Sequence, residues 1–184
     1  MIRLYLIRHG IAEEPTAGTP DDSRPLTAKG RRRFRRASRA FARKGEPLTH
    51  LFTSPLVRAV QTAEILARSL TRDEVSVLEE LRPGAPAAKV VEALASRAKD
   101  GDAIGLVGHD PQMSALVVVL AQLGPDDAAR VQFRKGAIVR IDVDALPPKR
   151  SEPRWHLRPR SRTFAEGAPL LKKATAAKPS RARR

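Results

Sequence analysis

The chain of 184 residues contains no cysteine. This absence excludes disulfide bonds, thiolate nucleophiles and cysteine-bound zinc, and it fits a reducing compartment. Long hydrophobic runs are also missing, because the longest one after the N-terminal segment, residues 113–123, is too short to span a bilayer. The charged Arg3 stands inside the early apolar run, which is not typical of a secretory signal. We therefore expect a soluble cytoplasmic protein.

Acidic side chains are scarce in two segments that together account for the whole net charge of +15. Residues 29–44 hold nine Lys or Arg and no acid, and residues 161–184 hold seven and one acid, Glu166. The first segment has helical spacing and indicates a solvated helix face. The second predicts a basic tail that contacts polyanions, whether nucleic acid, anionic lipid or an acidic protein. The tail has no motif that reads bases, so any nucleic-acid role would be auxiliary.

Strand and helix patterns alternate along the rest of the chain, which predicts βαβ units and a mainly parallel sheet of the α/β class. The predicted strands are 4–8, 50–53, 75–78, 103–108, 137–143 and 154–158, and the predicted helices are 28–44, 57–70, 87–98 and 111–123. The last two strands are expected to pair antiparallel. We expect one domain over residues 1–160. Residues 161–184 have few apolar side chains and are expected to be largely disordered, although Phe164 and Leu170–Leu171 could dock on the domain.

Polar side chains that could bind a ligand or take part in catalysis follow each of the first four predicted strands. They are Arg8 and His9 after the first strand, Ser54 and Arg58 after the second, Glu80 after the third and His109 after the fourth. If these strands are parallel neighbours, their carboxyl ends meet at the edge of the sheet where α/β proteins bind ligands. The sequence therefore predicts one site built from these segments.

Two arginines and two histidines with at most one nearby acid suit a tetrahedral dianion. Arginine matches phosphate oxygens with forked donors and keeps its charge. Gly10, which has no Cβ, would let the backbone bind close to such a ligand. A metal site is disfavoured because the flanking arginines repel a cation and carboxylate ligands are sparse. No metal or other cofactor is expected.

Three ordered motifs carry a resemblance to a known family. Residues 6–10 (Leu-Ile-Arg-His-Gly), residues 53–63 and residues 107–111 are similar to signatures of the histidine phosphatase superfamily, which has the phosphoglycerate-mutase-like fold. Residues 24–27 before Gly30, and residues 80–83, resemble the SixA-type phosphohistidine phosphatases. The resemblance covers about residues 1–160. It implies a three-layer α/β/α sandwich whose mainly parallel central sheet has antiparallel edge strands.

The resemblance also implies a mechanism. His9 would be the nucleophile that takes the phosphoryl group, while Arg8, Arg58 and His109 would bind its oxygens and stabilise the transition state. Glu80 is the candidate general acid for an alkoxide leaving group. The SixA branch is thought to lack a dedicated acid, which suits a phosphohistidine-bearing protein as substrate because a protonated imidazole leaves unaided.

Two other functions remain open at this point. The same clamp could serve a phosphatase of a small phosphoester or nucleotide, or a non-catalytic module that binds anions or nucleic acid. Mutase activity is less expected, since it needs a lid over a bisphosphate intermediate. His50 and His156 lie in no motif and are assigned structural roles. The sequence names neither the physiological substrate nor the oligomeric state.

Overall fold

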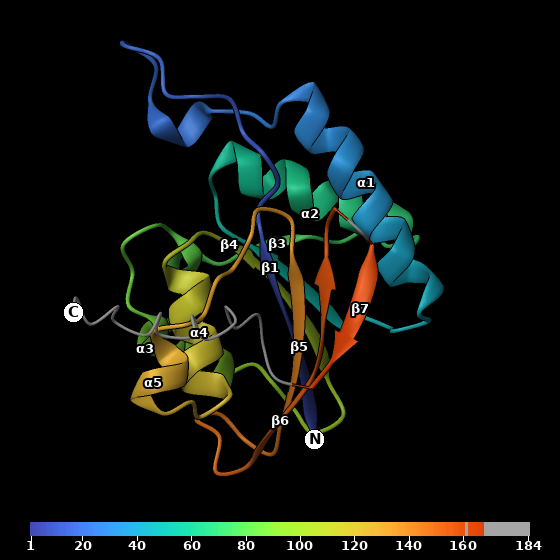
Figure 1. Ribbon diagram of the computed structural model, residues 1–184, viewed down its shortest axis with the longest axis vertical. Helices are drawn as coiled ribbons and strands as arrows, with labels where there is room; N and C mark the ends of the chain where they lie inside the picture. The colour runs from blue at the N-terminus through green and yellow to red at the C-terminus, as the bar shows by residue number, and fades with distance from the viewer. Residues whose placement is uncertain (161, 168–184) are drawn as a thin grey trace, which may run out of the picture.

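The computed structural model describes residues 1–160 and 162–167, and within these residues one seven-stranded sheet forms the centre of the molecule (Figure 1). The strands are β1 (Ile2–Arg8), β2 (His50–Thr53), β3 (Ser76–Val77), β4 (Ala103–Gly108), β5 (Ile138–Val143), β6 (Ser151–Arg158) and β7 (Thr163–Glu166). Their order across the sheet is β3-β2-β4-β1-β5-β6-β7. The first four are parallel neighbours, and β5, β6 and β7 are added antiparallel beyond β1. The predicted α/β class and antiparallel edge are confirmed.

Helices cover both faces of the sheet. They are α1 (Ala28–Arg43), α2 (Val57–Ser69), α3 (Ala87–Ala95), α4 (Gln112–Leu120) and the short α5 (Pro125–Ala128), with 3-10 turns η1 (Asp21–Ser23) and η2 (Glu79–Leu81). Figure 1 places α1 and α2 on one side and α3, α4 and α5 on the other. Strand β1 is buried on both faces, because Tyr5 and Ile7 pack with α1 and α2 while Leu4 and Leu6 pack with α3 and α4. The three-layer sandwich predicted from the motifs is present.

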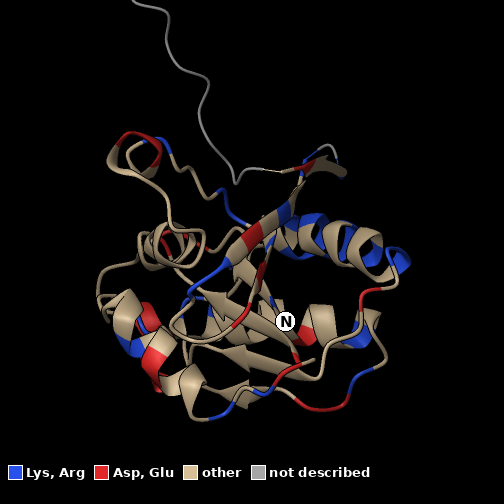
Figure 2. Cartoon of the chain, turned by 90° about the horizontal axis from the view of Figure 1, so that it is seen from below, with Lys and Arg blue, Asp and Glu red and all other residues tan. Residues whose placement is uncertain are grey.

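Helix α1 begins where its sequence predicts. The Thr27 side chain accepts a hydrogen bond from the Gly30 amide at 2.8 Å, which satisfies one of the free donors of the first turn. Gly30 is required by packing, because a Cβ there would lie 2.0 Å from the Ile11 carbonyl oxygen. The helix start is thus fixed against the chain just after β1. Lys and Arg positions recur along α1, where they colour the ribbon blue in Figure 2, and Arg32, Arg35, Arg36, Arg39 and Arg43 are exposed.

Several boundaries differ from those expected. Strand β3 keeps only two residues, α3 ends at Ala95 rather than residue 98, and α4 spans Gln112–Leu120. The sequence pattern missed α5, whose four residues are too few to show a period. None of the helices in the described ranges combines the length and apolar character needed to cross a membrane.

Strand β7 lies inside the segment that was assigned to the tail. It pairs with β6, and the Phe164 ring meets the Trp155 ring edge-on with centroids 5.0 Å apart. The Lys44 ammonium lies 4.9 Å from the Phe164 centroid, which adds a cation–π contact. Phe164 therefore docks on the domain as the sequence allowed, and the sheet continues past the predicted boundary at residue 160 because β7 pairs with the edge of β6. The expectation for residues 168–184 lies outside the described residues.

Candidate active site

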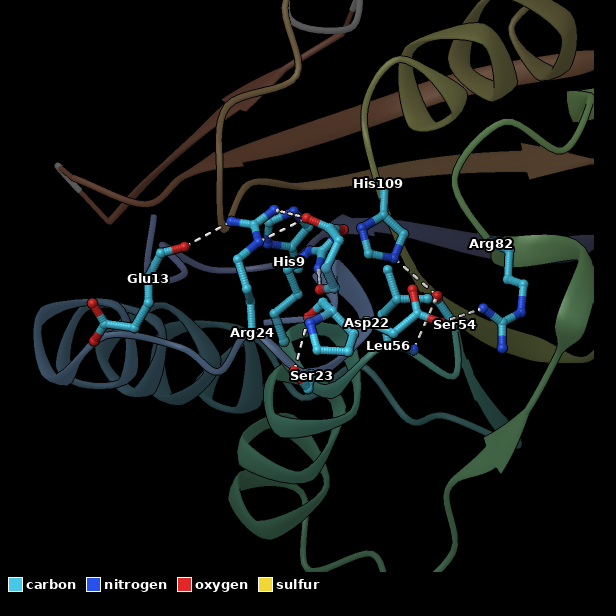
Figure 3. A network of polar contacts seen from close by, with 12 residues as sticks. His9, Glu13, Asp22, Ser23, Arg24, Ser54, Leu56, Arg82 and His109 are labelled. Carbon is cyan, nitrogen blue, oxygen red and sulfur yellow. Dashed lines mark hydrogen bonds and ion pairs between the residues drawn. The ribbon is translucent and has the colours of Figure 1, made fainter. Parts of the chain in front are cut away.

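The parallel arrangement of β1, β2 and β4 brings the predicted residues together at one edge of the sheet. The His9 and His109 rings lie with their centroids 5.0 Å apart, and Figure 3 shows both among polar side chains at this edge. Arg58 is 4% exposed, His109 3% and His9 7%. Burial of a charged side chain is costly unless a partner neutralises it, so Arg58 needs an acidic partner and the two buried rings favour their neutral forms.

His9 is held in one tautomer by the backbone. Its Nδ1 lies 2.7 Å from the Gly10 carbonyl oxygen, which can only accept, so Nδ1 carries the hydrogen and Nε2 keeps its lone pair. Burial lowers the pKa of His9 to about 3, and repulsion from His109, Arg58 and Arg8 adds to the effect of burial. The ring is therefore neutral at pH 7, with a free nitrogen lone pair at Nε2.

Gly10 links His9 to helix α2 through its backbone groups. Its amide donates to Thr62 Oγ1 at 3.1 Å, and its carbonyl accepts from His9, so both backbone groups are used within the protein. Thr62 Oγ1 in turn donates to the Arg58 carbonyl at 2.7 Å, which links the residue after β1 to helix α2. A Cβ on Gly10 would lie 3.2 Å from Leu26 Cδ2, so packing also favours glycine. The Gly10 carbonyl thus orients the His9 ring, and its amide is held by Thr62.

Arg8 is anchored by a backbone carbonyl and a carboxylate. Its Nη1 donates to the Phe133 carbonyl at 2.5 Å and lies 3.5 Å from Asp110 Oδ2. Burial lowers the pKa of Arg8, and Asp110 opposes that effect. The Phe133 carbonyl could not have been found from sequence, since it is 125 residues away along the chain. Asp110 follows His109 directly and could have been considered as a partner.

Arg58 is anchored by the turn η1. Its Nη1 donates to the Asp21 carbonyl at 2.7 Å, and its Nη2 pairs with Asp21 Oδ2 at 2.8 Å. Forked binding of phosphate by an arginine uses such Nη donors, but both Nη atoms of Arg58 already donate to Asp21, one to its carbonyl and one to its carboxylate. The sequence analysis missed this role of Asp21, although two adjacent acids in a loop of a basic chain were a usable signal.

His109 is anchored by a serine at the end of β2. Its Nε2 lies 2.8 Å from Ser54 Oγ, and Ser54 has no exposed surface. Burial lowers the pKa of His109 to about 4, with further lowering by Arg58 and Arg8, while Asp21 and Asp22 oppose the shift. Both histidines of the site are therefore uncharged at pH 7.

The three anchored side chains share one feature. Within residues 1–160 and 162–167, the buried atoms Arg8 Nε, Arg58 Nε and His109 Nδ1 have no hydrogen-bond partner. Unpaired buried nitrogens are uncommon in proteins, so three of them on the side chains that repel positive charge on His9 need an explanation. Over the same described ranges, no group of three or more His, Cys, Asp or Glu has a geometry that could hold a metal ion. An anion that accepts several hydrogen bonds fits these donors.

Glu80 is not among the groups that influence the pKa of His9 or His109. It is half-buried on η2, and its carbonyl accepts from Gln112 Nε2 at 2.7 Å. The carboxylates with the largest influence on His109 are Asp21 and Asp22, and Glu80 instead contributes to the raised pKa of Lys89 on α3. In the described ranges, the hydrogen bond of Glu80 is made by its backbone carbonyl, and no contact with His9 or His109 marks its carboxylate as an acid.

The chain is similar in sequence to known proteins. The model of the histidine phosphatase superfamily (branch 1) matches residues 4–83. An uncharacterized protein of Picosynechococcus sp. (strain ATCC 27264 / PCC 7002 / PR-6) is 34% identical over 164 residues, covering 85% of this chain and 99% of that protein. A probable phosphoglycerate mutase, GpmB, of Serratia proteamaculans (strain 568) is 30% identical over 129 residues, which is 63% of this chain and 58% of that protein.

Solved structures extend the comparison to the fold. The protein histidine phosphatase SixA, complexed with tungstate, superposes with a TM-score of 0.75 at 25% identity, covering 86% of this chain and 97% of that one. A mycobacterial glucosyl-3-phosphoglycerate phosphatase, in complex with inorganic phosphate, has the same fold at 20% identity and a TM-score of 0.62, covering 82% and 94%. The sequence match, the shared fold and the phosphatases among these structures agree with the anion-binding geometry described above. The chain is a phosphatase that belongs to the histidine phosphatase superfamily, in its SixA-like branch.

Proposed function

We propose that the protein is a protein phosphohistidine phosphatase that works through a phosphohistidine intermediate on His9. In the first step His9 Nε2 attacks phosphorus in line, the bond from phosphorus to the substrate imidazole breaks, and that imidazole leaves with its electron pair and takes a proton from solvent. In the second step water attacks the phosphoryl group on His9 and releases inorganic phosphate. Arg8, Arg58 and His109 bind the phosphoryl oxygens throughout.

The observation that carries this proposal is the set of three unpaired donors around a neutral imidazole. In the part of the chain with described positions, Arg8 Nε, Arg58 Nε and His109 Nδ1 are buried without partners, and each side chain is fixed at another nitrogen by the protein. Donors held in place before the substrate arrives stabilise the charge of the transition state without a reorganisation cost. Loss of Arg8 or Arg58 should lower the rate roughly 10²-fold or more.

The charge state of His9 supports its role as nucleophile. A nitrogen nucleophile must be unprotonated, and the pKa of about 3 keeps His9 neutral over the physiological range. The hydrogen bond from Nδ1 to the Gly10 carbonyl leaves Nε2 as the attacking atom and stabilises positive charge as the N–P bond forms. The same contact orients the ring.

The state of the nearby carboxylates favours phosphohistidine over an alkyl phosphoester. Burial alone would raise the pKa of Asp21, but hydrogen bonds from Arg24 and Arg58 bring the pKa below its ordinary value. Asp22 forms an ion pair with Arg82 at 2.7 Å. Both carboxylates are thus engaged with arginines rather than free to meet an alkoxide leaving group, whereas imidazole leaves without such help. The name of the SixA structure, a protein histidine phosphatase, points in the same direction.

The test is to trap the intermediate. The full chain is mixed with a ³²P-phosphohistidine protein, quenched after milliseconds, and assayed for acid-labile, alkali-stable phosphate on His9. We expect wild type and His50→Ala to form it, and His9→Ala to lose turnover by at least about 10³-fold. Wild-type turnover in His9→Ala would refute the mechanism. A kcat/KM higher for small phosphoesters than for the phosphohistidine protein would refute the substrate.

A further inference from the structure

We infer that Ser54 is a positioning residue that holds His109 in the tautomer with hydrogen on Nδ1, so that His109 presents a donor to the phosphoryl group. This inference rests on the proposed function, in which His109 binds a phosphoryl oxygen. Ser54 itself does not touch the substrate in this scheme. It acts through the ring of His109.

The Ser54 hydroxyl has two hydrogen-bond partners in the described ranges, His109 Nε2 and the Leu56 amide. Figure 3 shows the His109 ring pointing at Ser54, and the Leu56 amide directed at the same hydroxyl. The His109 Nε2–Ser54 Oγ distance is 2.8 Å, and the distance from the Leu56 nitrogen to Ser54 Oγ is 3.4 Å. Ser54 is the last residue before the Pro55 turn into α2, and none of its surface is exposed.

The donors and acceptors around Ser54 Oγ determine the direction of its hydrogen bond to His109. The Leu56 amide can only donate, so Ser54 Oγ accepts there. The Ser54 hydroxyl also has one hydrogen to give and, being buried, needs an acceptor. Among residues 1–160 and 162–167, the one acceptor within hydrogen-bond distance of Ser54 Oγ is His109 Nε2. Ser54 therefore donates, Nε2 accepts, and the hydrogen of the neutral ring lies on Nδ1.

The choice of tautomer decides what the ring offers to a phosphoryl group. His109 Nδ1 is one of the buried atoms without a partner in the described ranges, and its ring centroid lies 5.0 Å from that of His9. With hydrogen on Nδ1, the ring adds a third donor beside Arg8 Nε and Arg58 Nε. With hydrogen on Nε2, a lone pair would face the anion and repel it. The Ser54 hydroxyl thus determines whether His109 Nδ1 attracts or repels the phosphoryl group.

The first experiment reads the tautomer in the unmodified protein. Two-dimensional ¹H–¹⁵N correlation of the imidazole nitrogens is recorded on the full chain at pH 7, and the His109 signals are assigned by their loss in His109→Gln. We expect hydrogen on Nδ1 and a bare Nε2 before any ligand is added. Hydrogen on Nε2 would overturn the inference, whatever the behaviour of any variant.

The second experiment removes the hydroxyl. Ser54→Ala frees the ring to exchange between tautomers, so only a fraction of molecules is competent to bind. The dissociation constant of inorganic phosphate and kcat/KM should then worsen about 2- to 10-fold, because apparent affinity scales with the competent fraction. The NMR signals should show both tautomers. Ser54→Thr keeps the hydroxyl and should restore hydrogen on Nδ1.

Ser38→Ala is the matched control, because it also removes a buried hydroxyl, one that contacts Ser69 Oγ at 2.8 Å on the α1–α2 interface. We expect it to change neither the His109 signals nor phosphate affinity. A single Nδ1–H tautomer and wild-type affinity in Ser54→Ala would refute the inference. If Ser54→Ala does not fold, the tautomer of His109 in the wild-type protein and in Ser54→Thr tests the inference. Absence of phosphoenzyme on His9 would refute the proposed function while leaving the tautomer result standing.

Discussion

Acidification from pH 7 to pH 5 is expected to destabilise the fold through the two buried histidines of the site. The pKa of His9 is lowered to about 3 and that of His109 to about 4, chiefly by burial. In the unfolded chain both would titrate near the ordinary value of about 6.5. Between these values the unfolded state binds more protons, so stability rises with pH and is lost as pH falls below about 6.5.

The magnitude follows from the same values. With a folded pKa of 4 or below, each histidine loses about 2 kcal/mol of stability between pH 7 and pH 5, and the two together about 4 kcal/mol. This is a large part of the roughly 5–15 kcal/mol that stabilises a typical domain. The result depends little on the folded values, because at pH 5 both rings are still mostly neutral in the folded protein.

Urea unfolding at pH 7 and pH 5 measures the effect. The free energy of unfolding should fall by about 2 kcal/mol less in His9→Gln than in wild type, and likewise in His109→Gln. Carboxylates contribute equally to all proteins and cancel in the comparison. His50→Gln, at a side chain that is 44% exposed, should behave as wild type. If both site variants lost as much stability as wild type, the histidines would not be held neutral by burial.

Three further predictions concern the rim of the site and the tail. Asp21→Asn removes the carboxylate that pairs with Arg58 Nη2, so phosphate should bind roughly 3-fold more tightly as one negative charge is lost; weaker binding by calorimetry would contradict this. Glu80→Gln should change the hydrolysis of both an alkyl phosphomonoester and phosphohistidine by less than about 3-fold, because Glu80 makes its hydrogen bond through its backbone carbonyl rather than its carboxylate; a loss of about 10²-fold on the phosphomonoester alone in steady-state assays would show that Glu80 is the acid. Ending the chain at Gly167 removes six basic residues and no acid, so elution from heparin should need less salt while kcat/KM on a small phosphoester stays within about 2-fold; unchanged elution would show that the tail does not bind polyanions.

Local patterns were sufficient for most of the fold. The start of α1 at Ala28 and its cap at Thr27 follow from short-range chemistry. The bounds of β2 and β4 agree with their apolar runs. The patterns failed for β7, because its place in the sheet depends on Trp155 and the free edge of β6. Such partners are set by contacts between segments, which the sequence around residue 164 does not encode.

The amino-acid sequence by itself determined which side chains meet in the site, because strands in parallel order must place the residues that follow them at one edge. Arg8, His9, Arg58 and His109 therefore converge as the motifs predicted. Only the tertiary structure decided which nitrogen of each side chain is free. Partners such as the Phe133 carbonyl and Asp21 lie 125 and 37 residues from the arginines that they hold, and hydrogen-bond direction depends on those distant atoms rather than on neighbours in the chain.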